Sequence, residues 1–483
     1  MDIIARAAHL FGAAPALRTA DRTLSFAECD TEATRIAVRF LEAGARAGEI
    51  VALLSPNSPE AVLVLLGMLK AGLIAAPLNH RLPETQLRGM IDRLQPALLF
   101  HAGSPASLFD EKKAIELSSL FTEELPSIRS AALDPPEAME RLVSVIHTSA
   151  SSGVAKAAAH SFANHWYSAL GSNENIAFGP GDCWLLSLPL CHVGGYALLF
   201  RAFAGGGSLA LNYPQTTIEE ALKNHPVTHL SLVPTQLYRI LANGEAASRL
   251  GSLKAILLGG SPAPQSLFDE AASHNIPLYM SYGSTEMSSQ IATTSGTAGG
   301  RAEQSGKVLQ WREVMTAADG ELLVRGETLF QGYLSLGRLT PQTDSQGWFH
   351  TSDIGQVAED GTVRVLGRKD NMFISGGENI HPEEIEKALM SQEGILEAIV
   401  VPVPDPEYSL RPVAFIRAAN GGCDDETLRK AVQCMVGTLK TPVRLVRVEA
   451  WVTLSGSQKI DRMWYIREAS ASGRTPLEPQ HRE

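Results

Sequence analysis

A short segment in the first third of the chain gathers groups that can bind phosphate. Residues 148–156 read T-S-A-S-S-G-V-A-K, with four hydroxyls, a glycine and a lysine in nine residues. Backbone N–H groups, hydroxyls and an ammonium are the donors that a mobile polyphosphate needs. The segment lacks the spacing of a P-loop, so a P-loop NTPase is not predicted. Taken alone, it is more typical of a serine-rich surface turn.

Three further segments combine polar groups that could take part in chemistry. Residues 282–286 read Y-G-S-T-E, Asp353 closes a T-S-D turn, and Lys459 stands in G-S-Q-K-I-D-R at residues 456–462. Single residues of these types usually have ordinary roles, as a core tyrosine, a solvated turn carboxylate or a surface lysine. Their order along the chain, rather than any one of them, is therefore the informative feature.

Predicted strands precede several of these polar segments. Short β-branched or leucine-rich runs occur at residues 51–55, 97–101, 143–147, 184–188, 229–233 and 255–258, and segments with helical spacing, such as 59–70 and 218–224, separate them. This alternation predicts mostly parallel sheets covered by helices on both faces. Ligands of such sheets bind beyond the carboxyl ends of the strands, so we expect the site after residues 147, 188 and 258.

The pattern changes to short strands and turns beyond residue 320. Strands are expected at residues 321–325, 348–349, 355–357 and 362–366, and a small α+β unit follows, with helices at 382–390 and 425–435 and strands at 398–403 and 412–417. We therefore predict an α/β protein of two domains. Residues 1–368 form a large N-terminal domain of mixed and parallel sheets flanked by helices, plus a β-rich subdomain, and residues 369–483 form a small α+β C-terminal domain.

Composition excludes several classes of function. The 483 residues carry a formal charge of -11 without a long run of Lys or Arg, so no nucleic-acid partner is expected. The five cysteines are an odd number without a C-x-x-C pair, so neither a disulfide framework nor a zinc site follows. Lys70 and Pro77 interrupt the apolar run at residues 61–78, which predicts a buried helix and strand rather than a membrane span. Without a signal-like N-terminus, a cytoplasmic protein is expected.

Seven segments occur in an order that resembles the adenylate-forming enzymes, which include acyl- and aryl-CoA ligases, peptide-synthetase adenylation domains and luciferases. Residues 148–156 resemble the phosphate loop of that family, residues 188–195 its acyl-pocket segment, and residues 258–262 its adenine-side strand end. Residues 282–286 resemble its Y-G-x-T-E motif, 349–353 its ribose-binding segment, 367–370 its hinge and 456–462 its C-terminal lysine motif. The resemblance covers nearly the whole chain, and the order of the segments makes it very specific.

The resemblance implies a role for each matching residue. Thr285 is expected to contact the α-phosphate, Glu286 to hold Mg²⁺, which prefers oxygen ligands, and Asp353 to accept the ribose hydroxyls. Tyr282 offers a flat face for adenine, and Lys459 stabilises the charge that develops during adenylation. The remaining residues expected to bind ATP or coenzyme A are Thr148, Ser149, Ser151, Ser152, Gly153, Lys156, Gly259, Gly260, Ser261, Pro262, Ser281, Gly283, Arg368, Gly376 and Gly377. His192, as a catalytic residue, and Gly194 are expected to line the acid pocket.

The implied activity is that of an ATP-dependent acid–CoA ligase. A carboxylic acid reacts with ATP to give an acyl-adenylate and pyrophosphate, and the acyl group then passes to coenzyme A with release of AMP. Between these steps the C-terminal domain is expected to rotate about Asp370, which exchanges Lys459 for the loop of Gly376 and Gly377. The sequence does not determine the oligomeric state, and a homodimer is one alternative.

Within the family, three segments most resemble the o-succinylbenzoate–CoA ligases of menaquinone biosynthesis. They are residues 231–237 (S-L-V-P-T-Q-L), 257–264 and 373–384. A substrate with two carboxylates needs a second anchor, because an unpaired buried charge is costly. We predict that Thr235, at a helix N-cap, and Arg239, one turn later, face this acid. The alternative is that Arg239 lies only on the helix surface.

Departures from the family pattern lie in the phosphate loop and do not change the implied reaction class. Ala150, Ala155 and Ala157 replace the usual Gly, Pro and Gly of the phosphate loop, which puts its geometry and its affinity for ATP in question. The alternatives are a ligase for another aromatic or fatty acid, a stand-alone adenylation protein that loads a carrier, and a nucleotide-binding pseudoenzyme.

Overall fold

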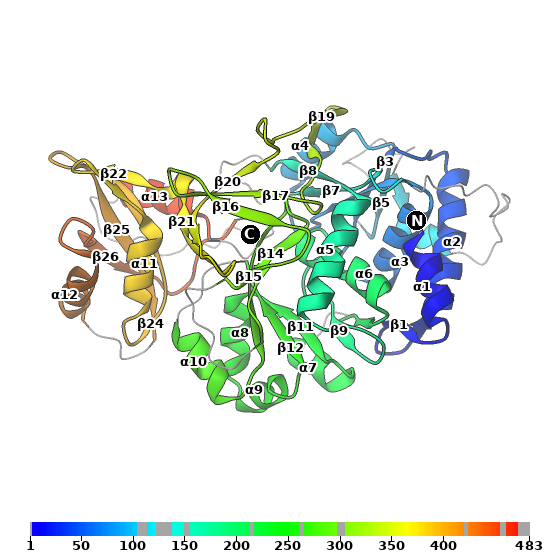
Figure 1. The fold of residues 1–483 in the computed structure, drawn as a ribbon, viewed down its shortest axis with the longest axis horizontal. Coiled ribbons are helices and arrows are strands. Elements are labelled where there is room, and N and C mark those ends of the chain that lie inside the picture. The colour runs from blue at the N-terminus through cyan, green and yellow to red at the C-terminus, as the bar shows by residue number, and fades with distance from the viewer. Residues whose placement is uncertain are drawn as a thin grey trace.

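The computed structural model describes residues 2–103, 114–121, 138–148, 155–212, 217–260, 265–296, 305–419, 424–454 and 460–471. No helix in these ranges is long and apolar enough to cross a membrane. The apolar run at residues 61–78 forms a buried helix followed by a buried strand, as predicted. Figure 1 shows the N-terminal helices in blue at one end of the molecule and the C-terminal unit in orange and red at the other.

One sheet of the N-terminal domain carries the phosphate-loop hairpin. Its strands follow the order β19-β18-β8-β7-β4-β3-β5-β6. The neighbouring strands β6, β5, β3, β4 and β7 pair parallel. The neighbouring strands β7, β8, β18 and β19 pair antiparallel. The strands are β3 (Ile50–Leu54), β4 (Ile74–Leu78), β5 (Leu98–His101), β6 (Ala114–Glu116), β7 (Leu142–His147), β8 (Ala157–Ser161), β18 (Gly332–Ser335) and β19 (Arg338–Thr340). The neighbouring helices are α2 (Phe26–Glu42), α3 (Pro59–Lys70), α4 (Glu84–Leu94) and η2 (Leu117–Phe121).

The second sheet brings the acyl-pocket, adenine-side and Y-G-S-T-E segments to the carboxyl ends of its strands. Its strands follow the order β15-β14-β13-β12-β11-β9-β10-β1-β2. The six neighbouring strands of this sheet that pair parallel are β13, β12, β11, β9, β10 and β1. They are β1 (Pro15–Arg18), β2 (Thr23–Ser25), β9 (Cys183–Leu185), β10 (Ser208–Ala210), β11 (His229–Leu232), β12 (Ala255–Leu258), β13 (Leu278–Ser284), β14 (Ser289–Thr293) and β15 (Lys307–Val308). The accompanying helices are α5 (Phe162–Asn175), α6 (Val193–Gly205), α7 (Ile218–Asn224), α8 (Pro234–Leu241), α9 (Gly244–Leu250) and α10 (Gln265–Ser273). The predicted mixed and parallel α/β class is confirmed.

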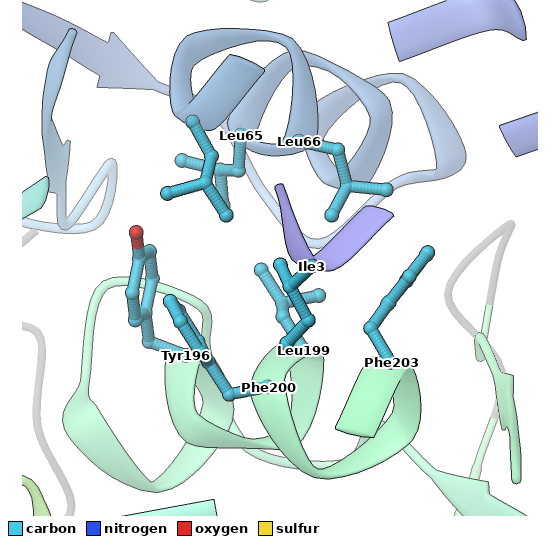
Figure 2. Close-up of a pocket in the computed structure, with 8 residues that line it drawn as sticks. Ile3, Leu65, Leu66, Tyr196, Leu199, Phe200 and Phe203 are labelled. Carbon is cyan, nitrogen blue, oxygen red and sulfur yellow. The ribbon is translucent and has the colours of Figure 1, made fainter. Parts of the chain in front are cut away.

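Apolar packing joins the first helix, α1 (Ile3–Phe11), to α3 and α6. Figure 2 shows Leu65 and Leu66 of α3 and Leu199 and Phe203 of α6 around Ile3 of α1, with Tyr196 and Phe200 beside them. The void among them holds only about 10 Å³. A void of that size is a packing feature and not a substrate pocket.

The β-rich subdomain follows as a four-stranded antiparallel sheet in the order β16-β17-β20-β21. It comprises β16 (Glu313–Thr316), β17 (Glu321–Arg325), β20 (Phe349–Val357) and β21 (Val363–Arg368). The expectation of separate strands at residues 348–349 and 355–357 is wrong, because β20 is continuous. β17 pairs with β20 on both sides of the polar T-S-D segment, at Phe349 and His350 and again at Ile354, with a register shift between them, and pairing with β21 begins at Asp353.

The C-terminal part has its own sheet and core. A 3₁₀ turn, η4 (Lys369–Asn371), leads from β21 into the hairpin of β22 (Phe373–Ser375) and β23 (Glu378–Ile380). The other elements are α11 (Pro382–Met390), β24 (Ile395–Asp405), β25 (Ser409–Ala418), α12 (Asp425–Val436), β26 (Arg444–Arg447) and α13 (Arg462–Ala471). Strands β24, β25 and β26 form one sheet, which confirms the predicted small α+β unit. The proposed boundary at residues 368 and 369 coincides with the end of β21.

Candidate active site

The predicted phosphate loop connects two antiparallel strands, β7 and β8. His147 pairs with Ala157, and the Thr148 N–H donates to the Lys156 carbonyl oxygen at 2.8 Å, which closes the base of the loop. Lys156 is exposed at this base. The other predicted residues of the loop, Ser149, Ser151, Ser152 and Gly153, and the substituted Ala150, lie outside the described residues.

The Y-G-S-T-E motif ends β13 and turns toward β14. Glu286 accepts a hydrogen bond at Oε1 from the Tyr333 hydroxyl at 2.7 Å, and the Lys156 ammonium lies 5.0 Å from the centre of the Tyr333 ring. Gly283 is required by close packing, because a Cβ there would lie 2.0 Å from the Ser289 carbonyl oxygen. The fold thus brings Lys156 and Glu286, 130 residues apart in sequence, next to the same tyrosine.

A buried histidine supports the backbone at Thr285. The His160 Nε2 lies 2.7 Å from the Thr285 carbonyl oxygen, and since a carbonyl only accepts, His160 donates. Burial lowers the pKa of His160 to about 4, so the ring is neutral at pH 7. His165 lies next to it, with ring centres 4.9 Å apart, and bonds to Ser144 Oγ at 2.7 Å. His160 was not predicted from the sequence, because a lone histidine in an alanine-rich strand carries no motif.

Three predicted nucleotide-binding residues meet from three different strands. The Tyr282 hydroxyl donates to Asp353 Oδ2 at 2.6 Å, and Arg368 Nη1 donates to Asp353 Oδ1 at 2.8 Å. Burial and the neighbouring Asp353 raise the pKa of Tyr282 well above its ordinary value, so the phenol stays protonated. Each carboxylate oxygen has two lone pairs, so Asp353 retains acceptor capacity for a ligand hydroxyl.

The adenine-side segment follows β12, next to β13. The Gly259 N–H donates to the Leu232 carbonyl oxygen at 3.2 Å, and Gly260 has a φ of 93°, a conformation that favours glycine. A Cβ on Gly259 would lie 3.4 Å from the Ser281 carbonyl oxygen, so these two predicted residues are neighbours. Ser261 and Pro262 lie outside the described residues.

The acyl-pocket segment forms the entry to α6. His192 is the N-cap residue of this helix, and a Cβ on Gly195 would lie 2.2 Å from the Pro189 carbonyl oxygen, so the turn is tight. Asn57 holds the segment in place, because its side chain donates to the Leu188 carbonyl oxygen and accepts from the Leu190 N–H, both at 2.9 Å. Asn57 precedes the segment by more than a hundred residues, so no local sequence signal points to it.

The predicted acid-anchoring pair is only partly supported by the geometry. Thr235 is not the N-cap of α8, because Val233 takes that place and Pro234 supplies the first helical residue. Proline fits the first turn, where its missing N–H costs nothing, and this displaces the cap by two residues. The Thr235 hydroxyl is buried without a hydrogen-bond partner among the described residues. Arg239 is exposed on α8.

A different arginine, Arg201 of α6, is buried without a carboxylate. It is 1% exposed, its Nη2 donates to Ser289 Oγ at 3.1 Å, and its guanidinium lies 5.4 Å from the centre of the Trp184 ring. Its Nε and Nη1 have no hydrogen-bond partner in the described part of the chain. Burial lowers the pKa of Arg201 to about 9. Such a cation favours a nearby anion, which the described residues do not supply.

The residues expected at the hinge and the CoA loop lie in turns. Asp370, in η4, accepts from Arg368 Nη2 at 2.9 Å, and the neighbouring Lys369 bridges Asp319 and Glu321 at 2.8 and 3.1 Å. Gly376 and Gly377 form the turn of the β22–β23 hairpin, with φ values of 55° and 86°. Positive φ at both central positions is the signature of a type I′ turn and favours glycine. Lys459 lies outside the described residues.

The residues around Glu286 fit a magnesium ion that arrives with a nucleotide. Among the described residues, no group of three or more His, Cys, Asp and Glu side chains could hold a metal by itself. Mg²⁺ is commonly held by one or two carboxylates together with substrate phosphates. A single carboxylate, with one oxygen held by Tyr333, matches that requirement.

Comparison with known proteins gives the same assignment over both parts of the chain. Residues 4–334 match the model of the AMP-binding enzyme family, and residues 384–459 match that of the AMP-binding enzyme C-terminal domain. The 2-succinylbenzoate–CoA ligase of Salmonella typhimurium is 35% identical over 446 residues, which covers 92% of each chain. The enzyme of that name from Escherichia coli is 34% identical over 92% of this chain and 93% of its own.

Solved structures are similar over nearly the whole length. The o-succinylbenzoate CoA synthetase of Bacillus subtilis in complex with the acyl-adenylate intermediate has a TM-score of 0.87 and 26% identity, and covers 96% of this chain and 97% of its own. The same enzyme in complex with ATP and magnesium ion has a TM-score of 0.84 at 26% identity, and covers 96% and 98%.

Proposed function

This chain belongs to the AMP-binding enzyme family, and we propose that it is a 2-succinylbenzoate–CoA ligase. The observation that carries this proposal is the 35% identity to a ligase of that name, because it extends over 92% of both chains and includes both domains. Related structures hold ATP with magnesium or the acyl-adenylate, which are ligands of the first half-reaction.

In the first half-reaction, a carboxylate oxygen of the acid attacks the α-phosphorus of ATP. The new O–P bond forms as the bond to pyrophosphate breaks, so positioning and charge neutralisation dominate catalysis. In the second, the CoA thiolate attacks the acyl carbon, a C–S bond forms, and the bond to AMP breaks. Acid, ATP and CoA are therefore converted into acyl-CoA, AMP and pyrophosphate.

In the proposal, different residues of the site bind the nucleoside, the phosphates and the reacting carboxylate. The cluster of Tyr282, Asp353 and Arg368 holds the nucleoside, Thr285 contacts the α-phosphate, and the β7–β8 loop with Lys156 contacts the polyphosphate. Glu286, together with the ATP phosphates, would hold a magnesium ion, which would supply charge neutralisation for the leaving pyrophosphate. Lys459 stabilises the charge shared by the acid's carboxylate and the α-phosphate.

The second carboxylate of succinylbenzoate needs a cation in its pocket. We assign this role to Arg201, which is buried, cationic and short of hydrogen-bond partners within the described residues. Its helix, α6, begins at the acyl-pocket residues His192 and Gly194. The exposed Arg239 can pair with solvent and has less need of an anionic ligand. A dianionic acid therefore suits the site better than a fatty acid does.

Coenzyme A and the domain rotation complete the proposal. The Gly376–Gly377 turn replaces Lys459 at the site after rotation about Asp370, so that the thiol can reach the adenylate. ATP and CoA are cytoplasmic metabolites, which places the proposed reaction in the cytoplasm. A homodimer remains an alternative to a monomer, and light scattering of the purified protein distinguishes the two.

Acid-dependent exchange of labelled pyrophosphate into ATP tests the first half-reaction and its specificity. A panel of 2-succinylbenzoate, benzoate, 4-phenylbutyrate and octanoate separates the dianionic substrate from mono-acids and fatty acids. Exchange that depends on 2-succinylbenzoate supports the proposal. ATP binding without exchange on any acid would instead identify a nucleotide-binding pseudoenzyme.

A further inference from the structure

Tyr333 lies between two residues that carry opposite charges in the proposed site. Its hydroxyl donates to Glu286 Oε1 at 2.7 Å, while the Lys156 ammonium lies 5.0 Å from the centre of its ring. Burial and the Glu286 carboxylate raise the pKa of Tyr333, so the phenol is protonated at any physiological pH. The same side chain thus supplies a donor to the carboxylate and a π face to the ammonium.

The backbone around Tyr333 is fixed independently of its side chain. Strand β18 pairs antiparallel with β8, with Tyr333 opposite Ala158, just after the phosphate loop. The Phe330 N–H donates to the Glu286 carbonyl oxygen at 2.7 Å, so the same segment also holds the turn that carries the carboxylate. The Phe330 ring packs edge-on against Tyr333, with centres 4.9 Å apart. The position of Tyr333 is therefore set by β8 and by the Y-G-S-T-E turn together.

This arrangement solves a problem that two nearby opposite charges create. If Glu286 and Lys156 formed a direct ion pair, the carboxylate would be less available to a metal and the ammonium less available to phosphate. The Lys156 ammonium lies over the ring, while the hydroxyl occupies one carboxylate oxygen of Glu286 and leaves the other for a hard cation. No ion pair joins the two residues in the described part of the chain.

We propose that Tyr333 is a positioning residue that keeps Glu286 available to magnesium and Lys156 available to the ATP phosphates. The inference rests on the proposed function, because it takes ATP with magnesium as the ligand. It assigns separate tasks to two parts of one side chain. The hydroxyl orients the metal-binding carboxylate, and the ring holds the phosphate-binding ammonium apart from it.

Calorimetric titration of ATP into the full-length protein, once with Mg²⁺ and once with EDTA, separates the two tasks without relying on turnover. Tyr333→Phe removes only the hydroxyl, so the dissociation constant for ATP should rise about three- to tenfold with Mg²⁺ and stay unchanged in EDTA. Tyr333→Leu also removes the ring, so it should weaken ATP binding in both buffers. Tyr167→Phe, at a tyrosine of α5 that packs on Trp311, is the matched control and should match wild type.

The outcomes that overturn the assignment are specific. Unchanged ATP binding by Tyr333→Phe in Mg²⁺, or equal loss in both buffers, excludes a role of the hydroxyl toward the metal. Wild-type binding of ATP by Tyr333→Leu in EDTA excludes the role of the ring toward Lys156. Failure of the proposed function is distinguishable, because a wild-type protein that binds ATP but never exchanges pyrophosphate would contradict the ligase assignment alone.

Discussion

Arg201 is a buried cation whose hydrogen bonds are incomplete within the described residues. It lies 1% exposed with two nitrogens that lack partners among the described residues, and burial lowers its pKa to about 9. Arg312 is also buried, but its three guanidinium nitrogens bond to oxygens of Gln290, Gln310 and Ser168. Arg312 is thus satisfied by the protein, whereas Arg201 has capacity left for a ligand.

Arg201→Met should therefore separate stability from substrate affinity. Methionine fills a similar apolar volume and removes an uncompensated charge, so the melting temperature should stay equal or rise. The Michaelis constant for 2-succinylbenzoate should increase at least about tenfold, which corresponds to roughly 1.4 kcal/mol. Thermal melting and pyrophosphate exchange measure the two effects. A lower melting temperature with an unchanged Michaelis constant would show that Arg201 has a structural role. A tenfold increase of the Michaelis constant in Arg239→Leu would instead show that Arg239 of α8 binds the second carboxylate.

Lys459 is assigned by its motif alone, so its role depends on kinetics. Lys459→Ala should lower acid-dependent pyrophosphate release by orders of magnitude, because the cation that neutralises the developing charge is lost. The reaction of a supplied acyl-adenylate with CoA should remain. Lys430→Ala, at an exposed lysine of α12 paired with Glu426, is the control and should leave both steps intact. Equal damage to both half-reactions by Lys459→Ala would exclude the assigned role.

The η4 turn is the short element on which the proposed domain rotation depends. It joins β21 of the β-rich subdomain to the β22–β23 hairpin, and Asp370 within it is held only by Arg368 among the described residues. Asp370→Pro fixes φ near -65° and removes an N–H, so one domain orientation should be favoured and the two half-reactions should become uncoupled.

Asp370→Ala is the control for that substitution, because it removes the carboxylate without restricting the backbone. Separate measurements of pyrophosphate release and of CoA-dependent AMP release from acyl-adenylate give the comparison. Wild-type rates for both steps in Asp370→Pro would contradict a hinge at this position.

The elements were more predictable from the sequence than their contacts. Helix α3 begins and ends at the predicted residues, and β12 has the predicted bounds, because apolar periodicity and flanking turns define both. The continuous β20 was not predicted, since its polar T-S-D segment reads as a turn although β17 pairs with β20 on both sides of it. The Val233 cap was missed because Pro234 shifts the start of α8.

Long-range partners account for the rest of what the sequence did not reveal. His160, Tyr333 and Asn57 contact motif residues through hydrogen bonds that join distant strands and turns. Nothing in their local sequence marks these contacts, because pairing between strands depends on the whole sheet. Arg201 was not predicted for a similar reason, since its burial follows from helix packing around Trp184 and Ser289.

At the scale of the whole molecule, buried neutral histidines make stability dependent on pH. Burial lowers the pKa of His147 and His160 to about 4, and that of His165 well below its ordinary 6.5. The unfolded chain takes up these protons near pH 6.5, while the native state stays neutral until about pH 4. Stability should therefore be full above pH 6.5 and fall as the pH decreases from 6.5 toward 4.

Urea unfolding at pH 7.5, 6.0 and 5.0 measures this effect. Each proton taken up on unfolding contributes about 1.4 kcal/mol per pH unit, and ordinary carboxylates titrate below this window. His9→Gln, at an exposed histidine of α1, should keep the slope. An unfolding free energy that is constant between pH 7.5 and 5.0 would contradict the neutral state of these histidines.

The proposed ligase cycle requires both the proposed nucleotide site in the N-terminal domain and the C-terminal unit. Formation of the CoA thioester from 2-succinylbenzoate, ATP, Mg²⁺ and CoA, followed by mass spectrometry of the product and by AMP release, tests this most directly. We expect one thioester and one AMP for each acid consumed, with kcat/KM for 2-succinylbenzoate above that for every mono-acid of the panel. Thioester formation only with another acid, or AMP release without any thioester, would contradict it.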